Sequence, residues 1–193
     1  MFMKLILLET AFLMTSFHIY AQELRRNSFG MSIGTGIPAT LSFKGAGGPD
    51  GMTVEAGFNY YRQMTGKIKF ETGLMWHRNK FEISNDSPPF TSYHYDVGLL
   101  YIPLLFRFTF AKYMFLQAGP LVDIDPRMNR TVKSQTGLGA GLGFGVEFPV
   151  LKKCVIQFSS YMNLHSLAIL KKDGYYPNPL CDIGMIKIGV RTR

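Results

Sequence analysis

The sequence predicts an all-β fold, an eight-stranded antiparallel up-and-down transmembrane β-barrel that follows a cleaved signal peptide. Three observations lead to this prediction. Apolar residues alternate with polar or small residues along eight segments, which is the two-residue period of a strand. The connections between the segments alternate between short and long. No segment after the N-terminal region is apolar enough over its length for a membrane-spanning helix.

The N-terminal region is predicted to be a signal for export. Lys4 supplies a positive charge, residues 5–20 are mostly apolar, and Ala21 offers a cleavage site before Gln22. The apolar run is shorter than the roughly 20 residues that a membrane-spanning helix needs. We therefore expect residues 1–21 to be a signal peptide and residues 22–193 to form one outer-membrane β-barrel domain.

The first five predicted strands each show one apolar row and one mixed row. In the segment 29–37, for example, Phe29, Met31 and Ile33 alternate with Gly30 and Ser32. A membrane barrel explains this arrangement, because its apolar row faces lipid and its mixed row faces the lumen. The five segments are residues 29–37, 52–61, 68–77, 100–110 and 114–124.

The sixth predicted strand, residues 135–148, shows the alternation most clearly. Its outward row runs from Thr136 to Phe148 and is otherwise apolar, whereas its inward row is almost entirely glycine. Glycines on the inside of a narrow barrel leave room for large side chains that cross the lumen. The inward glycines are Gly137, Gly139, Gly141, Gly143 and Gly145.

The seventh and eighth segments, residues 156–165 and 186–191, complete an even number of strands. Short periplasmic turns and long external loops are typical of outer-membrane barrels, with both termini in the periplasm. A soluble lipocalin-like barrel would instead carry apolar residues inside and charges outside. The short connections are residues 62–66, 111–112 and 149–153, and the long ones are residues 45–51, 84–92, 125–134 and 170–181.

Eight charged residues fall on the inward rows, and their charges balance. The interior of an eight-stranded barrel is just wide enough to be filled by side chains, and buried charges must pair. We therefore expect a structural network of ion pairs that fills the lumen, rather than a conducting pore. The residues are Glu55, Lys69, Glu71, Arg107, Asp123, Glu147, Lys187 and Arg191.

A catalytic site would need a nucleophile beside a base. The candidates are His165, Ser166 and His77, with Glu82 or Asp173 as an orienting acid. Adjacent residues on a strand face opposite sides, which separates His165 from Ser166, and His77 lies on a strand that is not a neighbour of theirs. The histidines also lack metal-ligand spacing. We therefore expect no enzymatic activity, no cofactor and no metal site.

Cys154 and Cys181 are placed at opposite ends of the barrel by this strand plan. A strand of about ten residues rises roughly 33 Å, far beyond the Cα separation of about 7 Å that a disulfide tolerates. We therefore expect no bridge between them, although the chain is exported.

The formal net charge of +8 arises from lysines and arginines that are scattered over turns, loops and strand faces. No basic helix or aromatic-basic motif accompanies them, which argues against nucleic acid as a partner. Outer-membrane lipid and lipopolysaccharide are the expected surroundings.

Three segments carry a family resemblance: residues 100–108 (LYIPLLFRF), residues 117–120 (QAGP) and residues 137–148 (GLGAGLGFGVEF). They resemble segments of the PorT-like outer-membrane β-barrels of Bacteroidota. The first is similar to the family pattern YLEIPLLLKY, with Tyr101 at the position of the family's acidic residue. The resemblance implies an outer-membrane barrel, and some members of the family are implicated in type IX protein secretion.

These observations favour a non-catalytic envelope scaffold in the bacterial outer membrane, which contacts periplasmic or outer-membrane protein partners. The alternatives are an accessory component of a protein secretion system and, less favoured, a lipid A-modifying enzyme.

Overall fold

The computed structural model of the protein describes residues 27–40, 50–84, 92–126, 135–169 and 180–192, so the expected signal peptide lies outside the described residues. Within these ranges no helix is long and apolar enough to cross a membrane. The described residues form eight strands: β1 (Asn27–Thr40), β2 (Asp50–Gln63), β3 (Ile68–Ser84), β4 (Ser92–Thr109), β5 (Met114–Ile124), β6 (Gly137–Leu151), β7 (Cys154–Ile169) and β8 (Leu180–Thr192).

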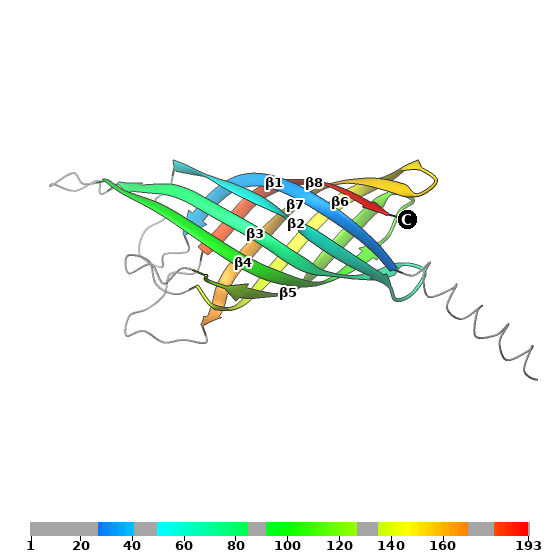
Figure 1. The fold of residues 1–193 in the computed structure, drawn as a ribbon, viewed down its shortest axis with the longest axis horizontal. Coiled ribbons are helices and arrows are strands. Elements are labelled where there is room, and N and C mark those ends of the chain that lie inside the picture. The colour runs from blue at the N-terminus through cyan, green and yellow to red at the C-terminus, as the bar shows by residue number, and fades with distance from the viewer. Residues whose placement is uncertain (1–26, 41–49, 85–91, 127–134, 170–179, 193) are drawn as a thin grey trace, which may run out of the picture.

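The strands form one closed barrel in sequence order (Figure 1). Each strand pairs in antiparallel fashion with its neighbours along the chain, and β1 closes the barrel against β8, where Met31 lies opposite Val190. Closure leaves no unpaired sheet edge, which a structure that spans the lipid bilayer requires. The predicted eight-stranded up-and-down barrel is confirmed.

The exterior of the barrel is apolar and the interior is polar. Phe29 and Phe144 are 65% and 61% exposed, and they alternate along their strands with buried or half-buried lumen residues. The buried residues include many polar and charged side chains, such as Glu55, Glu71 and Arg107. This arrangement is the reverse of a soluble barrel, and it suits a surface that lipid covers.

The glycine row of β6 faces the lumen, where large side chains lie against it. A Cβ atom added at Gly143 would stand 2.6 Å from Cβ of Tyr161, and one at Gly145 would stand 2.7 Å from Cζ of Phe115. Real Cβ atoms do not approach other atoms this closely. Glycine is therefore required along this wall, because Tyr161 and Phe115 occupy the space that larger residues would fill.

Replacing Gly143 with alanine should overpack the lumen, at a cost of about 1–3 kcal/mol in the free energy of unfolding. Gly98 of β4 is a matched control, because nothing lies within 4 Å of a Cβ atom added there. Urea unfolding of both variants in detergent micelles measures the difference. Equal stability of G143A and G98A would contradict the packing of this wall.

The two ends of the barrel differ. The tight turns 64–67, 110–113 and 152–153 lie at one end, the turn end, together with the last residues of β8; the longer connections leave from the other, the loop end (Figure 1). Cys154 lies opposite Thr192 at the turn end, whereas Cys181 lies opposite Leu164 near the loop end. Both cysteines are free, and their predicted separation is confirmed.

Outer-membrane barrels place short turns in the periplasm. In a C154S/C181S background, a cysteine at exposed Gly51, near the loop end, should react with a membrane-impermeant maleimide on intact cells. A cysteine at exposed Lys152, in the turn between β6 and β7, should react only after the outer membrane is opened. Labelling of the Lys152 position alone would reverse the orientation.

Strand β8 is longer than predicted, and it is not regular. It begins at Leu180 instead of near residue 186, and its register with β7 shifts between the pairs Tyr161–Met185 and Asn163–Asp182. Gly184 lies at this shift with a φ of +67°, a left-handed conformation that glycine adopts readily in β-bulges. The extra residue reverses the facing of the strand beyond it, so Asp182 is buried.

Candidate functional site: the charged lumen

The half of the lumen nearer the turn end is organised around the Arg107 side chain of β4, which is 1% exposed. Its guanidinium donates to Oε2 of Glu71 at 2.6 Å and to Oε1 of Gln157 at 2.9 Å, and two of its nitrogens donate to Oε1 of Gln117. It also lies 3.9 Å from the centre of the Phe115 ring. Arg107 thereby links four strands across the lumen.

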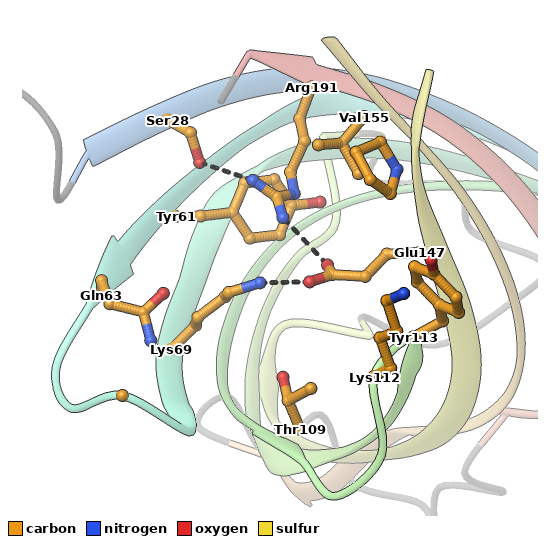
Figure 2. Close-up of a pocket in the computed structure, with 12 residues that line it drawn as sticks. Ser28, Tyr61, Gln63, Lys69, Thr109, Lys112, Tyr113, Glu147, Val155 and Arg191 are labelled. Atoms are coloured by element: carbon orange, nitrogen blue, oxygen red, sulfur yellow. Dashed lines mark hydrogen bonds and ion pairs between the residues drawn. The ribbon is translucent and has the colours of Figure 1, made fainter. Parts of the chain in front are cut away.

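A second set of charges surrounds Glu147 of β6 (Figure 2). Its carboxylate pairs with Lys69, accepts from Nη2 of Arg191 at 3.0 Å, and lies 3.5 Å from Nη1 of Arg107. One half-buried carboxylate is thus surrounded by three cations. Local positive charge therefore exceeds negative charge where the lumen opens at the turn end.

Beyond these charges lies a vestibule of about 500 Å³ that opens at the turn end (Figure 2). Its lining is mixed, with Gln63 and Lys69 on one side and Lys112 and Tyr113 on another. Lys112 Nζ lies 5.1 Å from the centre of the Tyr113 ring. The vestibule is large enough for several side chains of a ligand or partner.

The middle of the lumen is closed by apolar packing. Met75, Tyr101, Leu105 and Leu121 form a buried cluster that comes from β3, β4 and β5. The cavity beside them has a volume of about 10 Å³, which holds no more than one water molecule. Among the described residues, no wide aqueous path therefore joins the two ends.

Glu55 of β2 lies beside this cluster and is fully buried. Its Oε1 lies 2.6 Å from Nζ of Lys187, and it accepts hydrogen bonds of 2.5 Å from the hydroxyls of Tyr101 and Tyr161. Lys187 Nζ also lies 4.4 Å from the centre of the Tyr161 ring. This buried carboxylate has both a counter-charge and hydrogen-bond donors, as its burial requires.

A cluster of two histidines and two aspartates fills the lumen nearer the loop end. His77 of β3 and His165 of β7 meet across it, with ring centres 5.0 Å apart. Nε2 of each ring lies close to Oδ2 of Asp182, at 3.1 Å and 3.2 Å. Nδ1 of His165 lies 2.8 Å from Oδ1 of Asp123. All four side chains are buried.

The expectation that these histidines lie apart is wrong. Their strands are not neighbours, but the barrel is narrow, so inward side chains from opposite walls reach one another. The sequence assignment also missed Asp182, because the bulge at Gly184 turns it inward. A glycine three residues before the inward Lys187 was the only signal of that bulge in the sequence.

The expectation that Ser166 and His165 face opposite sides is also wrong. Ser166 has a φ of +56°. The register of β7 with β6 also shifts here, because Leu138 pairs with Ala168 whereas Ala140, two residues on, pairs with Leu164, four residues back. This irregularity buries both residues.

The Ser166 hydroxyl nevertheless donates to the Gln135 carbonyl, and its backbone N–H donates to Asp123 Oδ2 at 2.7 Å. The serine is therefore held by backbone and carboxylate contacts, and its hydroxyl proton is not directed at His165. Of the two acids considered as orienting groups, Glu82 lies opposite His94 in the ladder of β3 and β4. Asp173 lies outside the described residues.

All eight charged residues assigned to the lumen have an ion-pair partner within 4 Å. Asp123 pairs with His165, and the other seven pair among themselves. The seven are Glu55, Lys69, Glu71, Arg107, Glu147, Lys187 and Arg191.

Comparisons with known proteins show what this chain is similar to. The chain is similar to the crystal structure of the outer membrane protein OprG from Pseudomonas aeruginosa, with a TM-score of 0.44 and 12% sequence identity over 86% of this chain and 94% of that one. None of the curated proteins compared with the chain matches it. The family model of the outer membrane protein β-barrel domain matches residues 20–168. The chain belongs to this family, and its location is the bacterial outer membrane.

Proposed function

We propose that this protein is a non-catalytic scaffold of the outer membrane, whose barrel ends bind other envelope components. The filled lumen is the observation that carries this proposal. Buried Met75, Tyr101, Leu105 and Leu121 close its middle, and the charges on either side pair with one another. A barrel closed in this way is poorly suited to passive transport, which leaves its two ends for interaction.

The vestibule at the turn end is the contact site that we assign to a periplasmic protein partner. Lys69, Arg191 and Lys112 line it, with Glu147 as the acidic member. Electrostatic complementarity favours a partner segment that carries acidic side chains. At the loop end, exposed Lys80 on the exterior row of β3 suits the phosphate groups of lipopolysaccharide.

The absence of catalysis is part of the same proposal. A lipid A-modifying enzyme would need a serine activated by a base and open to the outer leaflet. Ser166 donates instead to a backbone carbonyl, and both Ser166 and His165 are buried in the lumen. These contacts support a structural role for the pair.

A role in type IX protein secretion is the second candidate, and the resemblance to PorT-like barrels of Bacteroidota favours it. The segments that carry the resemblance form the turn-end half of β4, the middle of β5 and most of β6. Arg107 and Glu147, which lie in two of these segments, hold the charges beside the vestibule. In this reading the vestibule binds a periplasmic component of the secretion machinery.

Photo-crosslinking in living cells tests the proposal. A photoreactive amino acid at Lys112, on the vestibule wall, should trap a discrete periplasmic or outer-membrane protein. The same amino acid at Leu142, which is exposed on the lipid face, is the matched control. Identical adducts from both positions, or no protein adduct at Lys112, would contradict a turn-end contact. A secretion-system protein as the adduct would select the second candidate.

A further inference from the structure

The cluster of His77, His165 and Asp182 has a geometry that direct contacts among its members do not explain. Nε2 of His77, Nε2 of His165 and Oδ2 of Asp182 are all buried, and none makes a hydrogen bond with any residue that the structure describes. Both nitrogens nevertheless lie within 3.2 Å of the Asp182 oxygen. The atoms are close, but they are not aligned for N–H···O bonds. The three atoms therefore remain available to bind a ligand.

The separations fit a metal ion. Zinc binds imidazole nitrogen at about 2.0–2.1 Å and carboxylate oxygen at about 2.0–2.2 Å, so two ligand atoms of a tetrahedral site lie about 3.3 Å apart. The two histidine–Asp182 distances are 3.1 Å and 3.2 Å. One ligand atom from each residue lies within 4.8 Å of those from the other two. The span of up to 4.8 Å exceeds the tetrahedral separation, so binding of the ion would draw the side chains together.

Two of the three members, His165 and Asp182, are oriented as ligands by the groups around them, whereas Nδ1 of His77 makes no hydrogen bond with a described residue. His165 has Nδ1 2.8 Å from Asp123, and a proton held on that nitrogen leaves Nε2 free to bind a metal. Oδ1 of Asp182 accepts from Thr53 and Asn79, both at 3.2 Å, which leaves Oδ2 for the ion. Hydrogen bonds of this kind orient the ligands in protein metal sites.

The charge balance points the same way. Asp123 and Asp182 are buried, and within the described part of the chain their only ion-pair partners are the two histidines. Glu55 is already balanced by Lys187. With both imidazoles neutral, as metal ligands are, these two buried carboxylates would carry two uncompensated negative charges, and with both imidazoles protonated the charges would already balance. A divalent cation would balance the two carboxylates in the neutral-imidazole state.

We propose that His77, His165 and Asp182 bind a divalent transition-metal ion, with zinc the best match, in the lumen near the loop end. Two imidazoles and one carboxylate suit zinc better than calcium or magnesium, which prefer oxygen ligands. The ion joins β3 to β7 and β8 across the barrel, beside the irregular register of β8. This replaces the expectation from sequence that the chain holds no metal.

The test uses the full mature chain without an affinity tag, refolded into detergent with Zn²⁺ and then dialysed. Elemental analysis should find about one zinc per chain, and removal by a chelator should lower the midpoint of thermal unfolding. H77Q, H165Q and D182N should each bind zinc at least ~10-fold more weakly, and D123N about 10–100-fold more weakly. H94Q is the matched control, because His94 is exposed on β4 and should leave binding unchanged.

Cobalt keeps the proposal testable if a ligand variant does not fold. Co²⁺ bound to the wild-type chain should give intense visible absorption typical of a four-coordinate site, and Zn²⁺ should displace it. A wild-type chain that retains no stoichiometric zinc and shows no such spectrum would overturn the proposal. It would also be overturned if folded D182N and H77Q kept wild-type affinity. Either result would assign the cluster to protonated histidines paired with aspartates.

Discussion

Replacing Arg107 with methionine is expected to lower the free energy of unfolding by about 3–5 kcal/mol, the range found when one partner of a buried ion pair is removed. Arg107 is 1% exposed and its partner Glu71 is 2% exposed. In the variant, the hydrogen bond of 3.1 Å from Asn59 is the only compensation for the buried charge of Glu71 that the described residues provide. Methionine retains most of the side-chain volume of arginine, so the loss of stability measures the effect of removing the charge. Urea unfolding in micelles measures it.

Two controls identify the cause. Arg78 and Asp96 form an ion pair at 2.5 Å on the exterior, with side chains 40% and 43% exposed, so R78M should lower the free energy of unfolding far less than R107M. The double variant R107M/E71Q should be more stable than R107M, because it leaves no unpaired carboxylate. If R107M cost no more than R78M, the charges near the turn end would not be a buried network.

Replacing Phe144 with arginine is expected to cost about 2–4 kcal/mol, the range for a cation on the lipid face at the bilayer midplane. Phe144 is 61% exposed and lies in the middle of β6, opposite Leu116 of β5. In the membrane its ring contacts acyl chains, and arginine would place a charge there. Unfolding of the variant in phospholipid vesicles measures the cost.

Val150 is the matched control for this substitution. It is an exposed apolar residue on the same strand, but it lies beside the turn 152–153, where an arginine should cost only about 0–1 kcal/mol. Similar costs for F144R and V150R would mean that the midpoint of β6 does not lie at the midpoint of the bilayer.

The fold could be predicted from the sequence because a membrane barrel imposes one rule on every residue. Lipid outside and a filled lumen inside turn the two-residue period into alternation of apolar with polar or small residues, as in β6. The facing of Arg107 and Glu147 followed directly from this rule. Strand ends were predicted less well, because β3, β4 and β8 continue beyond the apolar rows toward the loop end.

The histidine–aspartate cluster could not be predicted, for two physical reasons. Alternation assigns a residue to a face only while the strand is regular, and the irregularities at Ser166 and Gly184 bring Ser166 and Asp182 into the lumen. Alternation also does not predict where along the barrel axis a residue lies. The meeting of His77 and His165 depends on the stagger of strands on opposite walls, which is a property of the closed barrel.

Single-channel recording tests the central claim, that the lumen is closed, most directly. The purified chain is refolded and inserted into planar lipid bilayers, with a general porin in the same bilayers to show that openings are detectable. Because the buried cluster of Met75, Tyr101, Leu105 and Leu121 and the paired Glu55 beside it fill the middle of the lumen, the wild-type protein should give no stepwise current over a wide range of voltage. Discrete, reproducible openings of the wild-type protein would contradict the closed lumen and favour a transport function.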